Sequence, residues 1–281
     1  LIMRPAATDT AVEGASGAAA PDMPGGHTDG SVIFSWVGDA GNLGGAMVNW
    51  GGNLTLDHCA LLQNAATDNG GGIANALSGT LRLVDTTLSG NEAALGGGLH
   101  NASATTATLL RCTLDTNTAD SDGGALLNLG ALSLTNCTVS GNSANRSGGG
   151  VHHSMGNVSL TNCTLAGNIA DAGTPLGFGD GGGLFRVSGS LELANTIVAG
   201  NFDSVDNGGT GNIHPDISGT VSSLGYNLIG IGDGAVGIAD GANNDNVGLR
   251  LSPLASGLAP LADNGGPTET HLLQVASLAI D

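Results

Sequence analysis

Residues 148–168, GGGVHHSMGNVSLTNCTLAGN, form one complete unit of a pattern that runs through the chain. The unit opens on Gly148-Gly149-Gly150 and closes on Asn168. Between these ends, residues 158–161 (VSLT) and 163–165 (CTL) alternate between apolar and polar side chains. Alternation with a period of two is typical of a half-buried strand, and the unit lacks the 3.6-residue period of a helix. The unit therefore predicts short strands joined by turns that contain Gly and Asn.

Both ends of this unit recur along the chain. Gly-Gly elements begin at Gly44, Gly70, Gly96, Gly123, Gly148 and Gly181. The closing residue recurs at Asn64, Asn91, Asn117, Asn142, Asn168 and Asn201, at successive separations of 27, 26, 25, 26 and 33 residues. A fixed period indicates a repeat architecture, and about 26 residues hold three short strands and three turns. The sequence predicts an all-β protein, a right-handed three-sided parallel β-helix (β-solenoid) of eight or nine coils, with the hand taken from the crossover rule.

Composition divides the chain into three parts. Residues 1–30 form an N-terminal low-complexity arm, residues 31–230 the parallel β-helix, and residues 231–281 irregular C-terminal coils and a cap. The ends of a solenoid present unpaired strand edges, so Ser31–Val37 is predicted to cap the N-terminal end. The apolar start of the arm is expected to dock on its own solenoid or on a neighbouring subunit. Docking on a neighbour would produce a filament.

The charge balance excludes several partners. The chain has 24 carboxylates against 6 Arg, no Lys, and a net charge of −18. Nucleic acid is therefore not expected, because phosphate contacts need clustered Lys and Arg, and an anionic membrane surface is excluded for the same reason. No apolar run approaches the roughly 20 residues of a membrane-spanning segment. The chain opens on Leu1 without a signal-peptide pattern, so we expect a removed leader or a fragment of a longer protein.

Two columns of the repeat are predicted to be structural ladders. Cysteine recurs at one unit position, with Thr86 and Thr196 in the gaps; the cysteines are Cys59, Cys112, Cys137 and Cys163. Cysteine is a small hydrophobic residue that fits a tight interior corner, whereas parallel side chains suit a disulfide badly and the CxxC spacing of zinc sites is missing. The six closing Asn residues form the second ladder, in which stacked amides bond the coils above and below.

At these residues the sequence resembles known surface proteins. The Gly-Gly-Ala/Gly-aliphatic and xxx-Asn elements resemble the GGAI and FxxN repeats of the polymorphic outer-membrane proteins of chlamydiae, with Leu or Val in place of the aromatic residue. Residues 216–230 and 260–271 are similar to the end of bacterial choice-of-anchor Q proteins. The resemblance covers about residues 41–281. The resemblance implies a secreted or surface-displayed right-handed β-helix that is adhesive or structural. Proteins of this kind usually have a further C-terminal segment with an anchor, after the part that corresponds to the end of this sequence at Asp281.

Right-handed β-helices also include pectate lyases and polygalacturonases, so an enzyme is the alternative. A lyase needs a cation or basic side chains, and the two Arg residues on neighbouring coils, Arg82 and Arg111, occupy different unit positions. A hydrolase needs carboxylates about 5 to 9.5 Å apart, and Asp57, Asp85 and Asp115 also lie at different unit positions. No Gly-x-Ser-x-Gly element is present. The sequence therefore predicts no catalytic residues.

Other polar residues suggest sites for metals or sugars. Six acidic residues lie between the closing Asn and the next Gly-Gly element and are predicted as a solvated edge or a calcium site: Asp68, Glu92, Asp120, Asp122, Asp171 and Asp180. A weaker calcium pattern spans Asp240–Asn246. His58, His100, His152 and His153 are expected in different columns, which argues against a transition metal. Candidate glycosylation sites begin at Asn53, Asn101, Asn136, Asn145, Asn157 and Asn162.

Taken with the resemblance, these features predict a non-enzymatic, extracellular or cell-surface β-helix with a structural or adhesive role. Its expected partners are copies of itself, joined into a filament through the N-terminal arm and the solenoid ends, or surface glycans. Calcium is the one candidate cofactor. The alternative is a β-helix that binds or degrades carbohydrate.

Overall fold

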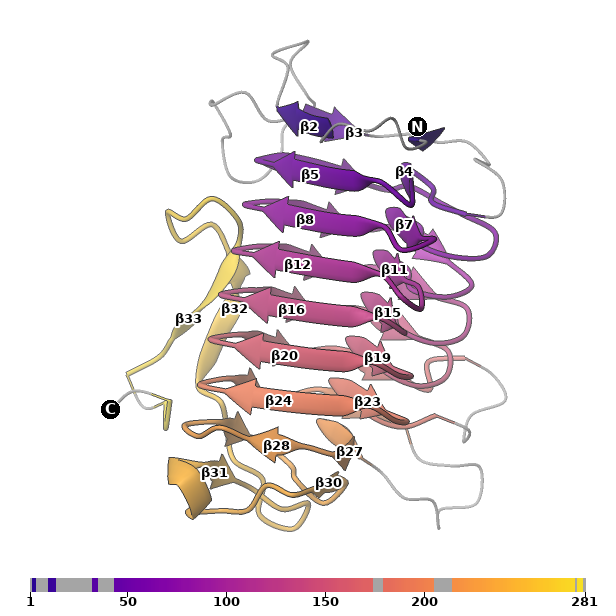
Figure 1. The fold of residues 1–281 in the computed structure, drawn as a ribbon. Coiled ribbons are helices and arrows are strands. Elements are labelled where there is room, and N and C mark those ends of the chain that lie inside the picture. The colour runs from indigo at the N-terminus through magenta and orange to yellow at the C-terminus, as the bar shows by residue number, and fades with distance from the viewer. Residues whose placement is uncertain are drawn as a thin grey trace.

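The computed structural model describes residues 43–173, 179–204, 214–275 and 277–279, together with three short strands nearer the N-terminus. The chain winds into a parallel β-solenoid, which confirms the predicted fold class (Figure 1). The front strands in Figure 1 run to the left while the chain descends, so the solenoid is right-handed. Apart from one 3-10 turn, Ala242–Asn244, every regular element in the described residues is a β-strand.

Each coil contributes one strand to each of three long sheets, except that the last coil has no strand in sheet 2. Sheet 1 contains β1 (Ile2–Met3), β4 (Met47–Trp50), β7 (Ile73–Ala76), β11 (Leu99–Asn101), β15 (Leu126–Asn128), β19 (Val151–His153), β23 (Leu184–Arg186), β27 (Ile217–Thr220) and β30 (Ala235–Val236). Sheet 2 contains β2 (Thr10–Glu13), β5 (Asn53–Asp57), β8 (Thr80–Val84), β12 (Thr106–Leu110), β16 (Ala131–Thr135), β20 (Asn157–Thr161), β24 (Ser190–Ala194) and β28 (Ser222–Ser223). Sheet 3 contains β3 (Val32–Phe34), β6 (Cys59–Leu62), β9 (Thr87–Ser89), β13 (Thr113–Asp115), β17 (Thr138–Ser140), β21 (Thr164–Ala166), β25 (Ile197–Val198), β29 (Leu228–Ile229) and β31 (Asn246–Val247).

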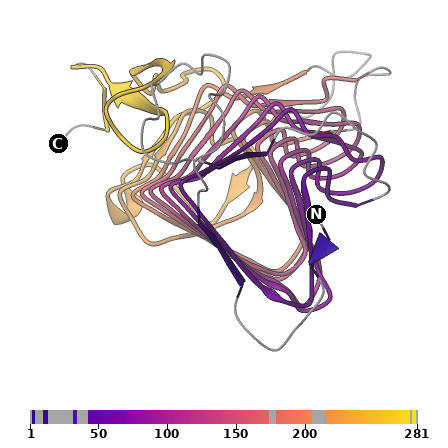
Figure 2. The ribbon, with the colours of Figure 1, turned by 90° about the horizontal axis from the view of Figure 1, so that it is seen from above.

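A short fourth sheet, which the sequence did not predict, lies where each coil passes from sheet 3 back to sheet 1. Sheet 4 contains β10 (Glu92–Ala93), β14 (Thr118–Ala119), β18 (Ser143–Ala144), β22 (Ile169–Ala170) and β26 (Phe202–Asp203). These two-residue strands directly follow the closing Asn of each unit. Viewed along the solenoid axis, the coils superimpose around one central core (Figure 2).

The core consists of aliphatic columns, because strand register places equivalent residues of successive coils side by side. Leu83 pairs with Leu109, and Leu109 with Leu134, at one inward-facing position of sheet 2. All three are fully buried, and similar columns line sheets 1 and 3. Each buried Leu contributes about 1.5–3 kcal/mol relative to an exposed one. The alternation seen in the sequence is therefore the division between this core and the outer faces.

The Gly-Gly elements serve two purposes, a turn of the chain and a close approach between coils. Gly123 has φ +74°, a backbone conformation that side chains with a Cβ atom disfavour. Gly124 lies so close to the next coil that a Cβ atom there would sit 2.3 Å from the carbonyl oxygen of Gly149. One Gly thus turns the chain and the next allows the coils to stack.

At the two ends, the chain pairs with its own solenoid. The described strands β1, β2 and β3 add to β4, β5 and β6 in parallel register, so Val32–Phe34 of the predicted cap forms the outermost strand of sheet 3. The rest of the predicted arm (1–30) and cap (31–37) lies outside the described residues. Filament formation through the arm stays a prediction.

The C-terminal segment differs from the predicted cap. Its last two strands, β32 (Leu258–Ala262) and β33 (Thr270–Leu273), form an antiparallel hairpin that lies alongside the solenoid instead of across its end (Figure 1). The Thr113 hydroxyl on sheet 3 donates a 2.6 Å hydrogen bond to the Glu269 carbonyl. Polar side chains on the outer face of sheet 3 therefore hold this segment. In the described residues, no helix is long and apolar enough to span a membrane.

Candidate functional site

The predicted Asn column forms a continuous interior ladder. The six residues are buried, and the amide nitrogen of each of the first five donates to the amide oxygen of the Asn on the next coil, at 2.8 to 2.9 Å. That oxygen also accepts the backbone N–H of the preceding Asn, as Asn117 does from Asn91 at 3.0 Å. Each rung therefore joins two coils by two hydrogen bonds inside the core. The ladder uses its polar groups for structure.

The ladder ends on a carboxylate that the sequence analysis did not single out. One oxygen of Asp216 accepts the backbone and side-chain N–H groups of Asn201, at 3.0 and 2.9 Å. The other accepts the Ile231 N–H at 2.7 Å. Burial raises the pKa of Asp216 to about 6, although these donors oppose the shift. The aligned amide donors of the ladder therefore end on a group that titrates near neutral pH.

This shift predicts a pH-dependent stability. Because the folded state raises the pKa of Asp216 above the ordinary value of about 3.9, the stabilisation is complete at low pH and is lost as pH rises through about 6. From pH 4 to pH 7.5 we expect the wild type to lose about 2 kcal/mol relative to Asp216→Asn. Urea unfolding across this range measures the difference. Asp263→Asn, at an exposed residue, is the control; equal pH slopes for wild type and Asp216→Asn would contradict the prediction.

A second interior ladder runs through sheet 1 and was missed. Amides of Asn49, Asn75, Asn101 and Asn128 bond in series at 2.8 to 2.9 Å, and the Asn128 amide nitrogen lies 3.3 Å from Nδ1 of His153. The near-26-residue spacing of these Asn residues was the available signal. Because Asn101 is fully buried in this ladder, the predicted glycosylation there is wrong. Of the other candidate sites, Asn53, Asn136, Asn157 and Asn162 are exposed and Asn145 is half-buried.

The cysteine column lies in the interior, and none of its four members is disulfide-bonded. The Cys112 N–H donates to the Cys137 sulfur at 3.5 Å, and the Cys59 N–H donates to the Thr86 hydroxyl at 3.3 Å. Burial raises the pKa of the Cys112 and Cys163 thiols, which keeps them protonated. Hydrogen bonds from Cys112 and Cys163 lower the pKa of Cys137, which lies between them. All four side chains are buried and pack the core.

The position before the cysteine column forms an exposed corner that brings charged residues together. Arg111 donates from Nε and Nη2 to the two oxygens of Asp85, each at 2.6 Å. His58 lies between Asp57, at 2.7 Å, and Asp85, at 3.7 Å. The expectation that Asp57 and Asp85 would not converge is therefore wrong. In the described residues, Asp57, His58 and Asp85 are the one set of three candidate metal ligands within 4.8 Å of one another.

This corner differs from a typical metal site or carboxylate pair. The Arg111 guanidinium occupies both oxygens of Asp85, and the hydrogen bond to Asp85 raises the pKa of Arg111. Further along the corner, Asn195 donates to Asn162 and Asn162 to Asn136, at 2.9 and 3.0 Å. The residue before the cysteine column has a left-handed backbone on each of six successive coils, and this conformation turns the side chains outwards. The six residues are His58, Asp85, Arg111, Asn136, Asn162 and Asn195. The group works as a surface ladder of ion pairs and amides.

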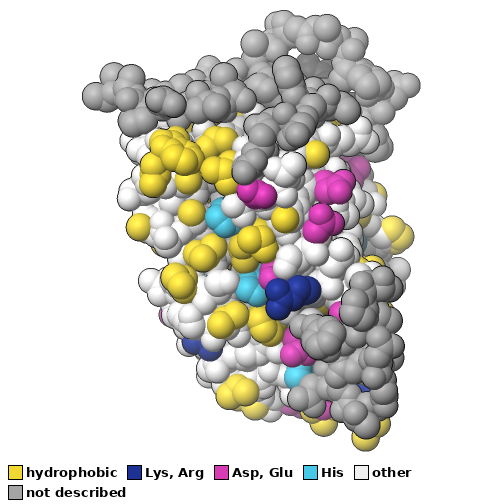
Figure 3. Space-filling model, turned by 90° about the vertical axis from the view of Figure 1, so that its right-hand side faces the viewer, with side chains coloured by type: hydrophobic (Ala, Val, Ile, Leu, Met, Phe, Trp, Pro, Cys, Tyr) yellow, Lys and Arg dark blue, Asp and Glu magenta, His cyan; other side chains and the backbone are white. Residues whose placement is uncertain are grey.

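The expectation that the histidines occupy different columns is wrong for two residues of sheet 1, His100 and His152. Register places His100, Leu127 and His152 in one row on the outer side of the sheet, so His100 and His152 share a column. The next residue in the row is Phe185, whose ring centroid lies 5.1 Å from that of His152. Burial lowers the pKa of His100 to about 4 and also lowers that of His152. Figure 3 shows this face of the molecule, on which hydrophobic side chains (yellow) lie next to His side chains (cyan).

The six acidic residues of the predicted edge have unequal surroundings. Asp68, Glu92 and Asp120 are exposed, Asp122 and Asp180 are half-buried, and Asp171 is buried. No three of them bring ligand atoms within 4.8 Å of one another in the described residues. In the weaker pattern, Asp245 is buried and accepts the Asn227 amide at 2.9 Å, so it extends a ladder.

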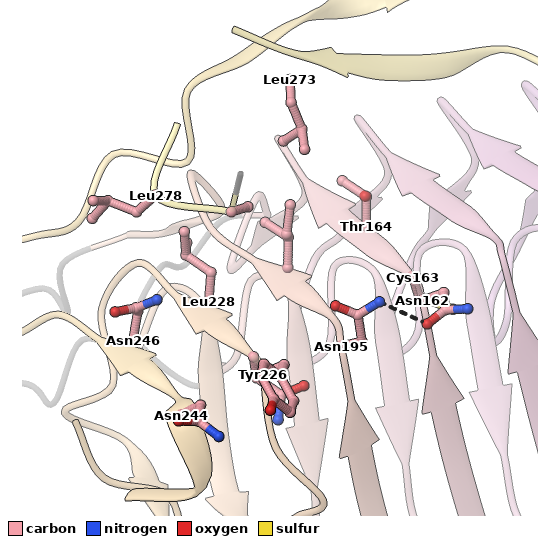
Figure 4. A pocket seen from close by; sticks show the side chains of 13 residues that line it. Asn162, Cys163, Thr164, Asn195, Tyr226, Leu228, Asn244, Asn246, Leu273 and Leu278 are labelled. Atoms are coloured by element: carbon pink, nitrogen blue, oxygen red, sulfur yellow. Dashed lines mark hydrogen bonds between the residues drawn. The ribbon is translucent and has the colours of Figure 1, made fainter. Parts of the chain in front are cut away.

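Two hollows remain as candidate binding surfaces. The larger, about 460 Å³, lies on the outer face of sheet 2, and we call it the sheet 2 groove. Its lining residues are Thr106, Ala107, Thr108, Ala131, Leu132, Ser133, Asn157, Val158, Ser159, Ser190 and Glu192. The smaller, about 250 Å³, lies between the solenoid and the C-terminal segment. Figure 4 shows Leu273 and Leu278 of that segment beside it, together with the Asn195–Asn162 hydrogen bond.

Comparison with family models, with curated proteins and with solved structures finds no match to this chain.

Proposed function

We propose that the protein is a non-enzymatic β-solenoid of the cell surface or extracellular space, which adheres to neutral glycans through the sheet 2 groove. The observation that carries this proposal is the lining of the groove. Hydroxyl and amide side chains from four successive strands, β12, β16, β20 and β24, face outwards in it. Such groups both donate and accept hydrogen bonds, as sugar hydroxyls require.

The charges around the groove favour binding over catalysis. Glu192 is the one carboxylate in its lining, whereas glycoside hydrolysis uses two carboxyl groups about 5 to 9.5 Å apart. The charged residues of the exposed corner, Asp85 and Arg111, neutralise each other. A groove that repeats its short polar side chains about every 4.8 Å, one set per coil, suits an extended, uncharged polymer. The resemblance of the repeats to surface proteins supports the extracellular location.

Co-sedimentation with suspended cellulose, chitin and mannan tests the proposal. We expect the full chain to pellet with at least one of these polysaccharides and to release no reducing ends. Ser159→Glu places a charge in the groove beside Ser133, whose hydroxyl lies 3.3 Å from that of Ser159, and should weaken retention at least tenfold. Thr118→Glu, at an exposed position of sheet 4, is the matched control and should bind like wild type.

Two results would contradict the proposal. Release of reducing ends would identify the alternative, a polysaccharide-degrading β-helix. Absence of retention on every polysaccharide, or equal retention of Ser159→Glu and Thr118→Glu, would exclude the sheet 2 groove as an adhesive surface.

A further inference from the structure

One column of sheet 4 changes its chemistry at the last strand. Register aligns Ala93, Ala119, Ala144 and Ala170 on successive coils, and these four side chains are buried. The next strand pairs Asp203 with Ala170, and Asp203 is also buried, with 3% of its surface exposed. A carboxyl group thus occupies a place that the preceding coils fill with a methyl group. Burial of a carboxylate is unfavourable unless it is paired, so this exception needs a physical reason.

The hydrogen bonds of Asp203 satisfy only half of the carboxyl group. One oxygen, Oδ2, accepts the His214 backbone N–H at 2.8 Å. The other, Oδ1, is inaccessible to solvent and has no hydrogen-bond partner among the residues that the structure describes. Native structures rarely leave a buried polar atom without a partner, and a bound ion is one common explanation.

The surroundings of Asp203 add negative charge. The neighbour of Asp203, Ser204, donates its hydroxyl to Asp171 at 3.1 Å, and His214, which bonds Asp203 through its backbone, contacts Asp180 through its ring. Burial raises the pKa of Asp203 to about 7, and the charges of Asp180 and Asp171 add to the shift. Nδ1 of His214 lies 2.9 Å from a carboxylate oxygen of Asp180. The imidazole of His214 acts against the carboxylates and lowers the pKa of Asp203. The guanidinium of Arg146, on the same edge, contacts Asp122 at 3.6 Å. Three carboxyl groups therefore lie beside one imidazole in the described part of this edge.

We propose that Asp203, together with Asp171 and Asp180, binds a calcium ion between the last two coils of sheet 4. Calcium takes oxygen ligands at 2.3–2.6 Å in flexible geometry, and its charge offsets the repulsion of the three carboxylates. In this structure their ligand atoms are not all within 4.8 Å of one another, so binding draws them closer. The unpartnered Asp203 oxygen distinguishes this site from the other acidic residues of the edge. The proposal is independent of the sheet 2 groove.

Equilibrium dialysis and thermal unfolding of the full chain at pH 7.5, with calcium chloride or with EDTA, test the site. We expect one calcium ion to bind and to raise Tm by about 5 °C. Asp203→Ala restores the residue of the four preceding coils. It should bind no calcium, show no calcium-dependent shift, and unfold in EDTA at a higher temperature than the wild type because a buried carboxyl group is gone.

The control is Asp120→Ala, which removes an exposed carboxylate from the same edge and should leave calcium binding unchanged. Asp203→Asn keeps the shape of the side chain and decides the result if the alanine variant does not fold, as monitored by circular dichroism. A wild type that binds no calcium, or Asp203 variants that bind it as the wild type does, would overturn the proposal.

Discussion

Replacing Asn117 with alanine is expected to lower the free energy of unfolding by about 3–5 kcal/mol, because it interrupts the interior Asn ladder. The Asn117 amide oxygen accepts two N–H groups of Asn91, at 3.0 and 2.9 Å. Its amide nitrogen donates to the Leu88 carbonyl and to the Asn142 amide oxygen, each at 2.9 Å. Alanine leaves these buried partners without hydrogen bonds and without access to water. Each unsatisfied buried group costs about 1–3 kcal/mol.

Equilibrium unfolding in urea measures this loss. Asn157→Ala is the matched control, because Asn157 lies exposed on the outer face of sheet 2, where its amide oxygen accepts one bond from Ser190. We expect the control to change stability by less than about 0.5 kcal/mol. If the two variants were equally stable, the buried amide chain would not be what holds adjacent coils together.

Gly124→Ala is expected to lower the free energy of unfolding by about 3 kcal/mol or more and to prevent folding at 37 °C. The new Cβ atom would lie 2.3 Å from the Gly149 carbonyl oxygen and 2.5 Å from that of Ser143. Both atoms belong to the backbone of the next coil, which hydrogen bonds hold in place, as between the Gly124 N–H and the Gly148 carbonyl at 3.1 Å. The clash can therefore be relieved only by separating the coils.

The matched control is Gly266→Ala in the C-terminal segment, where the nearest atom that a Cβ would meet, the Thr268 carbonyl oxygen, is 3.5 Å away. Soluble yield and urea unfolding compare the two variants. A Gly124→Ala protein as stable as the Gly266→Ala protein would show that the coils can move apart at little cost.

The repeat period was a reliable guide wherever units have equal length. In a solenoid the residue one period away is also the neighbour on the next coil, so the Asn column could be aligned by counting. Counting failed for His100 and His152, which share a row although the sequence analysis put them in different columns. Counting from the closing Asn does place Asp203 in the alanine column, two residues after Asn201, but only the structure shows that its carboxyl group is buried there.

The sequence by itself determined the all-β solenoid, its period of about 26 residues and the members of the Asn and Cys columns, because these depend on local alternation and on neighbours one period apart. The tertiary structure alone decided the other contacts. At the corner, folding brought ligand atoms of Asp57 and Asp85 within 4.8 Å of one another, although the two residues lie at different unit positions. Folding also placed Thr113 against Glu269, 156 residues further along the chain. No periodic pattern encodes that contact, because it depends on how the whole chain closes on itself.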